Sequence, residues 1–257
     1  AARDAQSADP DAIAPEVRSL MDALGLEQLY SHQAEAVRLA VGGEDMLVAT
    51  GTASGKTLCY TLPILRRLRT EPNATALLLF PTKALCQDQF RGFARRLEQA
   101  GLSEHLAGVF DGDTPSALRR RLRDQGTAIF SNPDMVHAAL MPQHARWADF
   151  LSRMRFLVLD EMHVYSGIFG SNMPLMLRRL FRLCEHYGSR PQVIACSATI
   201  ANPCELGERL IQRPMRLVDR DGSPRGRKTY VLWNPPRIRA TTWRSRRSAN
   251  VEAHELM

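Results

Sequence analysis

The stretch Ala49-Thr50-Gly51-Thr52-Ala53-Ser54-Gly55-Lys56-Thr57 decides how this chain folds. The apolar run Met46–Ala49 precedes it, and a helical pattern continues from it through Leu68. Small residues allow backbone N–H groups to turn inward around phosphate oxygens, and the N-terminus of the next helix adds a positive field. The order of strand, small-residue loop and helix therefore predicts a phosphate-binding loop.

The residue types in this loop predict a nucleoside triphosphate as the ligand. Lys56 is expected to reach the β- and γ-phosphates, and the Thr57 hydroxyl is expected to ligate Mg²⁺. Thr50 stands where the strict pattern G-x-x-x-x-G-K-[ST] has its first glycine. A Gly-Lys-Thr turn without function is the alternative, and the flanking strand and helix disfavour it. The residues expected to contact the nucleotide are Thr52, Ala53, Ser54, Gly55, Lys56 and Thr57.

Size and composition are those of an ordinary globular protein, with 257 residues, 44% hydrophobic and 24% charged. No apolar run approaches the ~18 residues of a membrane span, and the first residues lack the apolar core of a signal peptide. The five cysteines form no C-x-x-C pair and mostly lie in apolar contexts, which predicts free buried thiols in the cytoplasm and no zinc site. Because the chain lacks an initial Met and ends within a helical pattern, we expect a fragment of a longer protein.

The net charge of +7 is unevenly distributed along the chain. Residues 1–212 carry 23 Lys/Arg and 23 Asp/Glu, whereas residues 213–247 carry 11 Lys/Arg and only two acidic residues. The basic excess is therefore a C-terminal feature. It fits either a surface that contacts a phosphate backbone or a solvated loop, and the sequence leaves both open.

Short apolar runs alternate with helical patterns, which predicts an α/β fold with a mostly parallel sheet covered by helices on both faces. The domain boundaries expected are a lead-in with a short helix at 1–28, an ATP-binding lobe at 29–218, and a basic linker with the start of a second lobe at 219–257. The predicted strands are Met46–Ala49, Ala76–Phe80, Ala107–Phe110, Thr127–Phe130, Phe156–Leu159, Val193–Cys196, Met215–Val218 and Thr229–Trp233. The predicted helices are Pro15–Leu24, Ser31–Val41 with Ser31 as its cap, Gly55–Leu68, Lys83–Gln99, Thr114–Asp124, Met135–Leu140, Gly170–Tyr187, Pro203–Ile211 and Asn250–Met257.

Two adjacent carboxylates follow the apolar strand Phe156–Leu159. Asp160 is expected to hold Mg²⁺, and Glu161 to orient and polarise the water that attacks the γ-phosphate. For Asp160 to approach Lys56, we expect their two strands to be neighbours in the sheet. A surface Asp-Glu pair is the alternative, and the upstream phosphate loop favours catalysis.

The turn Cys196-Ser197-Ala198-Thr199 also follows an apolar strand. Hydroxyls beside a γ-phosphate can relay its state, so Ser197 and Thr199 are candidate coupling residues that hydrogen-bond to the turn Asp160–His163. A plain Ser-Ala-Thr turn is the alternative.

These three motifs, in this order, resemble those of superfamily 2 helicases of the DEAD/DEAH type. The resemblance implies a RecA-like first lobe that binds ATP and Mg²⁺, with His163 completing the catalytic motif Asp160-Glu161-Met162-His163. Tyr30-Ser31-His32-Gln33 is similar to the family's Q motif. This similarity implies that the Gln33 amide contacts the adenine edge and that Tyr30 contacts the ring.

Three further segments match positions that line the nucleic-acid track in this family. Pro81–Leu85 is similar to motif Ia, which implies that Thr82 and Lys83 contact a strand's phosphates. The other two segments follow later strands, and each is equally well explained as a turn or a helix cap. Their candidate residues are Asp111, Gly112, Asp113, Thr114, Asn132 and Asp134.

Softer stretches, such as Tyr165–Ser171, are similar to the MrfA-like DNA-repair branch of these helicases. This similarity implies 3′ to 5′ movement on single-stranded or forked DNA. Motifs IV to VI and their arginine finger are missing, so the chain is expected to work with a second RecA-like lobe and to bind and hydrolyse ATP weakly alone. An RNA-directed ATPase and a nucleotide-responsive binding module with little turnover are the alternatives. A kinase or transporter is disfavoured, because those lack the motifs after the two later strands.

Overall fold

The computed structural model describes residues 3–9, 13–165, 170–198, 201–227, 229, 232–236 and 246–256. The chain forms two compact units: Asp4–Pro224, and Arg225–Met257 together with Ala1–Arg3. The larger unit holds the sheet and the predicted site.

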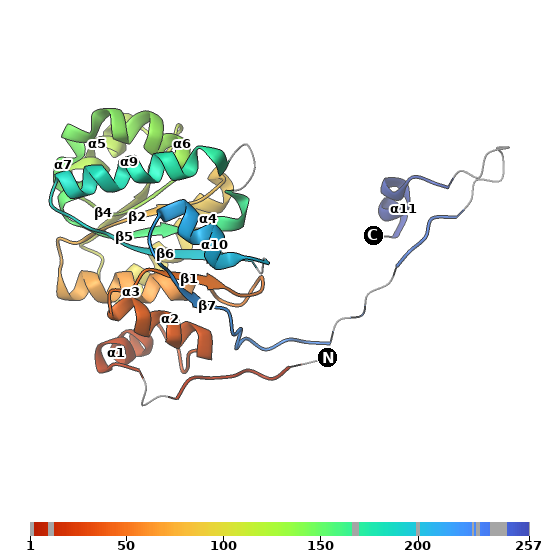
Figure 1. The fold of residues 1–257 in the computed structure, drawn as a ribbon. Helices are drawn as coiled ribbons and strands as arrows, with labels where there is room; N and C mark the ends of the chain where they lie inside the picture. Colours follow the sequence, from red (N-terminus) through yellow and green to blue (C-terminus); the bar gives the residue numbers. More distant parts are fainter. Residues whose placement is uncertain are drawn as a thin grey trace. The chain divides into compact units, whose positions relative to one another are not determined.

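The larger unit is built on a seven-stranded sheet in which every strand pair is parallel, in the order β3-β4-β2-β5-β6-β1-β7 (Figure 1). The predicted α/β class is confirmed. Most of the strands are short and fully buried, because helices cover both faces and leave no face for alternating polar residues. The strands are β1 (Met46–Ala49), β2 (Thr75–Leu79), β3 (Leu106–Val109), β4 (Gly126–Ser131), β5 (Met154–Leu159), β6 (Gln192–Ser197) and β7 (Arg216–Val218).

Two apolar layers lie on the two faces of the sheet. Helices α1 to α4 contribute to the first layer, and α5, η2, α7, α9 and α10 contribute to the second. The helices are α1 (Pro15–Ala23), α2 (Ser31–Val41), α3 (Thr57–Thr70), α4 (Lys83–Gln99), α5 (Ser116–Gln125), α6 (Pro133–Met135), η2 (Val136–Leu140), η3 (Met141–Trp147), α7 (Ala148–Ser152), η4 (Met162–Val164), α9 (Met173–His186) and α10 (Pro203–Ile211).

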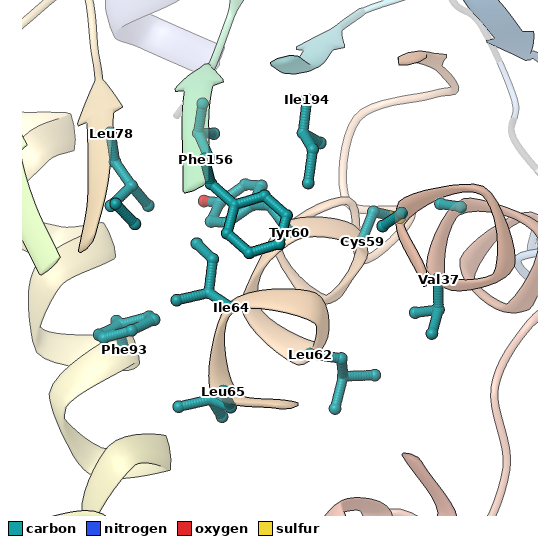
Figure 2. Packing of buried hydrophobic residues seen from close by; sticks show 14 of the residues in the cluster. Val37, Cys59, Tyr60, Leu62, Ile64, Leu65, Leu78, Phe93, Phe156 and Ile194 are labelled. Atoms are coloured by element: carbon teal, nitrogen blue, oxygen red, sulfur yellow. The ribbon is translucent and has the colours of Figure 1, made fainter. Parts of the chain in front are cut away.

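Helix α3 is the central element of the first layer, which fixes the phosphate loop at its N-terminus. Figure 2 shows Tyr60 and Ile64 of α3 directed toward side chains of the sheet, including Phe156 of β5. Tyr60, Leu62 and Ile64 are at most 1% exposed. Fully burying each such side chain contributes roughly 1.5–3 kcal/mol.

Three sequence-based expectations differ from the structure. The helix predicted over Met135–Leu140 is the junction of α6 with the π-helix η2. Helical turns continue in η3, which is kinked at Gln143, and in α7, and both of these elements were missed. Ser31 is the first helical residue of α2, and Tyr30 is its cap. In the region Thr229–Trp233 no strand is found among the described residues, and residues 230 and 231 lie outside them.

The smaller unit contains α11 (Ala249–Leu256). The indole Nε1 of Trp233 donates a hydrogen bond to Glu252 at 3.0 Å, and Arg247 pairs with the Glu252 carboxylate at 2.9 Å. Most of the predicted basic stretch, residues 237–245, lies outside the described residues. Across the described chain no helix is both long and apolar enough to cross a membrane. The five thiols are free and four are buried, as predicted; burial raises the pKa of Cys59 to about 12.

Candidate nucleotide and nucleic-acid site

The predicted phosphate, magnesium and coupling residues follow the carboxyl ends of β1, β5 and β6, and the predicted adenine residues Tyr30 and Gln33 lie at the start of α2. The order β5-β6-β1 places one strand between those that precede Lys56 and Asp160, so the expectation that these strands are neighbours was wrong. The phosphate loop and Asp160 are still linked, because α3 begins at the loop and places a side chain at the end of β5. The phenol of Tyr60 on α3 donates to Asp160 Oδ2 at 3.3 Å.

The phosphate loop between β1 and α3 is open toward a ligand. Among the described residues, the backbone N–H groups of Ala53, Ser54, Gly55 and Lys56 have no hydrogen-bond acceptor. Unpaired N–H groups at a helix N-terminus form an anion site. Two residues adopt left-handed backbone, Ala53 at φ 60° and Gly55 at φ 82°, which shapes the turn.

Thr50, the departure from the strict motif, takes a structural part in the loop. Its hydroxyl lies 2.7 Å from that of Ser54, and both residues are about 1% exposed. Lys56 extends over the loop and donates to the carbonyl oxygens of Thr50 at 3.1 Å and Gly51 at 2.8 Å. Its ammonium group therefore lies within the loop where a phosphate would be held.

The predicted adenine residue, Gln33, is buried and bonded within the protein. Its Oε1 accepts from the Tyr30 N–H at 2.9 Å, and its Nε2 donates to the Gly55 carbonyl at 3.1 Å. The structure thus brings Gln33 to the phosphate loop. The Tyr30 ring is half-buried and stacks against His32 at a centroid distance of 6.0 Å.

A chain of hydrogen bonds joins the two predicted Mg²⁺ residues. The hydroxyl of Thr57 and the phenol of Tyr60 both lie 3.1 Å from Gln89 Oε1, and the same phenol contacts Asp160. A phenol has one proton, so it donates to Gln89 or to Asp160 at any moment. Thr57 and Asp160 are therefore linked through Gln89 and Tyr60.

Burial raises the pKa of Asp160 to about 6, while the Glu161 N–H, bonded to Asp160 Oδ1 at 2.9 Å, opposes the shift. No cluster of three potential ligands exists among the described residues. One buried carboxylate and one hydroxyl fit Mg²⁺, which keeps several waters and takes other ligands from substrate phosphates. Glu161 is held at φ 49°, a strained conformation for a residue other than glycine.

The turns after β5 and β6 are joined by a backbone contact. His163 Nδ1 lies 3.4 Å from the Ala198 amide nitrogen and 3.3 Å from Glu161 Oε2. A neutral Nδ1 accepts from Ala198, whereas a protonated one pairs with Glu161, so the two contacts exclude each other. Ser197 Oγ is buried without a partner among the described residues, and Thr199 lies outside them.

The predicted nucleic-acid residues follow β2, β3 and β4, on the other half of the same edge. Thr82 caps α4 by accepting from the Leu85 N–H at 3.3 Å. Exposed Lys83 reaches the next turn and pairs with Asp113 at 2.6 Å, and this hydrogen bond raises the pKa of Lys83. Gly112 lies beside this ion pair.

Asp111 and Asn132 are used to close their own turns. Asp111 is 3% exposed; burial raises its pKa, but hydrogen bonds from Thr114 and the Asp113 N–H outweigh this and leave the pKa below its usual value. The Asn132 Oδ1 accepts from the Met135 N–H at 2.9 Å and caps α6, while the Asp134 side chain is exposed.

A family model for DEAD/DEAH box helicases matches residues 30–206 of this chain. The chain belongs to the DEAD/DEAH box helicase family. Its fold is RecA-like, as predicted: the superposition on the DEAD-box helicase Mss116 gives a TM-score of 0.68 at 15% identity.

Several longer helicases resemble this DEAD/DEAH domain closely. The ATP-dependent helicase YprA of Bacillus subtilis is 43% identical over 96% of this chain, and HRQ1 of Saccharomyces cerevisiae is 41% identical over 87%. The solved structure of the helicase MrfA bound to DNA and AMPPNP is 42% identical, with a TM-score of 0.89 over 99% of this chain. The chain spans 33% of YprA, 21% of HRQ1 and 35% of the MrfA chain.

The structure adds residues that the sequence analysis missed in this helicase domain. His32 lies in the segment similar to the Q motif and Gln89 in the predicted helix Lys83–Gln99, but neither was assigned a role from the sequence. Arg119 donates to the carbonyls of Asp111, Gly112 and Thr114 at 2.7–2.8 Å and holds that loop. Polar residues on otherwise apolar helix faces were the available signal for His32 and Tyr60.

Proposed function

We propose that residues 29–218 form the first ATP-binding lobe of an ATP-dependent DNA helicase or translocase. The observation that carries this proposal is the phosphate loop with its unpaired N–H groups and Lys56, joined through Tyr60 to the buried carboxylate of Asp160. The MrfA structure bound to DNA and AMPPNP, at 42% identity, supports both ligands.

We assign each residue of the nucleotide half a part in the reaction. The loop N–H groups and Lys56 hold the phosphates, and Thr57 and Asp160 hold Mg²⁺, which supplies charge neutralisation at the phosphates. Glu161 orients the attacking water, and its left-handed backbone fixes where its carboxylate lies. Gln33 and Tyr30 are the proposed adenine contacts; Gln33 must release an internal bond to make them.

A nucleic-acid strand is proposed to cross the ends of β2, β3 and β4. Lys83 and the capped N-terminus of α4 are proposed to contact its phosphates, which makes binding insensitive to sequence. Asp111 and Asn132 act there by holding turns, while Gly112, Asp113, Thr114 and Asp134 border the track. Ser197 and Thr199 are proposed to couple the two halves.

DNA is the proposed substrate because the close relative MrfA is solved with DNA, whereas the Mss116 likeness shows the fold alone. A second RecA-like lobe is the proposed partner, since relatives are three to five times longer and a second lobe contributes an arginine finger. Movement from 3′ to 5′, forked DNA as substrate and a role in DNA repair remain predictions from the resemblance of the motifs.

The test is Glu161→Gln in the complete protein. The variant is expected to bind an ATP analogue as the wild type does but to lose DNA-stimulated turnover, because Gln cannot polarise water as a carboxylate does. Unchanged turnover would contradict the role of Glu161 and favour a nucleotide-responsive binding module. Stimulation by RNA but not by DNA would transfer the protein to the RNA-directed class.

A further inference from the structure

A buried histidine connects the phosphate loop to the segment Asp219–Pro224, which follows β7. His32 is 0% exposed, and its Nε2 lies 2.9 Å from the Ser54 carbonyl oxygen. The Gly222 N–H donates to His32 Nδ1 at 3.1 Å. An amide N–H can only donate, so Nδ1 is the acceptor and Nε2 carries the proton that bonds Ser54. The neutral tautomer with its proton on Nε2 therefore makes both hydrogen bonds.

Helix α2 orients two consecutive peptide groups of the loop. His32 holds the Ser54 carbonyl, and Gln33 Nε2 holds the Gly55 carbonyl. Because C=O and N–H point in opposite directions in a trans peptide, the N–H groups of Gly55 and Lys56 point away from α2. These are two of the N–H groups that have no acceptor among the described residues.

Gly222, like the loop, is held by several contacts within the protein. The Gly222 carbonyl accepts from the Gln6 N–H at 2.8 Å, and a Cβ at Gly222 would lie 2.2 Å from Ser31 Oγ. Asp221 accepts from the Ser223 N–H and hydroxyl at 2.9 and 2.6 Å, and both residues are at most 8% exposed. This segment is therefore a packed turn, and the chain passes from it into the second compact unit at Arg225.

We propose that His32 is a positioning residue that couples the nucleotide state of the loop to the segment Asp219–Pro224. The proposal rests on the proposed function, because the ligand is ATP. A phosphate that accepts from the N–H of Gly55 polarises the same peptide group and strengthens the bond from His32 to the Ser54 carbonyl. The ring is then held more firmly, and so is Gly222. By reciprocity, holding Gly222 favours nucleotide binding.

Two isosteric substitutions separate the ends of the connection. In His32→Asn the Oδ1 takes the place of Nδ1 and keeps the Gly222 bond, but nothing reaches Ser54. In His32→Gln the Nε2 takes the place of the ring Nε2 and keeps the Ser54 bond, but the acceptor for Gly222 is lost. Both are measured in the complete protein by titration with a non-hydrolysable ATP analogue and Mg²⁺, and by hydrogen exchange of the Gly222 amide.

The two variants are expected to fail in different ways. His32→Asn should bind the analogue roughly 3- to 10-fold more weakly, the cost of one hydrogen bond, and exchange at Gly222 should no longer respond to the analogue. His32→Gln should retain more affinity, and Gly222 should exchange rapidly with or without the analogue. In the wild type the analogue should slow exchange at Gly222.

Thr75→Val is the matched control, because it removes another buried hydrogen bond, 2.8 Å to the Phe150 carbonyl, in a residue that is 1% exposed and outside the site. It should lower the melting temperature without changing affinity or exchange at Gly222. Wild-type affinity in His32→Asn, with a nucleotide-dependent Gly222 amide, would overturn the proposal and leave the proposed function intact. A wild type that binds no analogue would overturn both.

Discussion

At the ends of β1, β5 and β6, side chains hydrogen-bond across elements far apart in the sequence, whereas at the ends of β2, β3 and β4 they mostly close their own turns. Tyr60 contacts Asp160 and His32 contacts Ser54, in buried surroundings. Thr82 and Asn132 each cap the helix that follows them, and the pair of Lys83 with Asp113, which joins two turns, is exposed. The difference fits the proposed function, in which a preformed nucleotide site lies beside an open surface that contacts nucleic-acid phosphates.

The largest expected effect comes from removing the carboxylate charge of Asp160, in the buried half of the site. Asp160→Asn should lower ATP turnover by roughly 10²- to 10⁴-fold, because several kcal/mol of transition-state stabilisation depend on a bound metal. Turnover in a coupled assay at saturating Mg²⁺-ATP measures it. A loss of less than tenfold would show that Asp160 is not the metal residue.

The same substitution should stabilise the protein in the absence of nucleotide. Burial raises the pKa of Asp160 from 3.8 to about 6, so its ionisation opposes folding, and this cost grows as pH rises from about 4 to 6. At pH 7 the cost is about 3 kcal/mol. Denaturant unfolding of both proteins at pH 4 and pH 7 measures it: Asp160→Asn should be more stable at pH 7 only. Equal stability at both pH values would contradict the raised pKa of this buried carboxylate.

In the exposed half, at the ends of β2, β3 and β4, substitutions should change DNA binding only through their charge. Lys83→Ala should weaken single-stranded DNA binding and reduce the slope of log affinity against log salt by roughly 0.7, the value for one phosphate contact. Asp113→Asn, the matched partner, should strengthen binding, because it removes a carboxylate that competes with phosphate for Lys83. Anisotropy titrations at several salt concentrations measure both. A loss confined to one DNA sequence would contradict backbone contact.

The smallest expected effect tests backbone strain in the loop. Ala53 is held at φ 60°, which costs an L-residue roughly 1–2 kcal/mol. Glycine would remove this strain but would lose about 0.4–1 kcal/mol more conformational entropy on folding. Ala53→Gly should therefore raise the free energy of unfolding by about 0.5–1 kcal/mol. Chemical denaturation measures it, and a decrease would show that the conformation of Ala53 carries no strain.

The nucleotide half could be predicted from the sequence because its chemistry lies in contiguous motifs. Short apolar runs predicted β1 to β7. The motif Gly55-Lys56-Thr57 follows β1, and Asp160-Glu161 follows β5. The strand order was not readable, because a parallel sheet of buried strands fits many orders, and this produced the wrong neighbour expectation. The contacts of His32 and Gln89 were missed because they depend on how helices pack, and periodicity cannot show that.

The most direct test of the central claim is ATP turnover by the complete protein, with and without single-stranded DNA or RNA, beside Lys56→Ala and a surface control. Arg209→Ala is that control, since its exposed side chain pairs with the exposed Glu205 at 2.6 Å. We predict strong stimulation by DNA in the wild type and in Arg209→Ala, and none in Lys56→Ala. Stimulated turnover that survives in Lys56→Ala, or no turnover with either nucleic acid, would contradict the account.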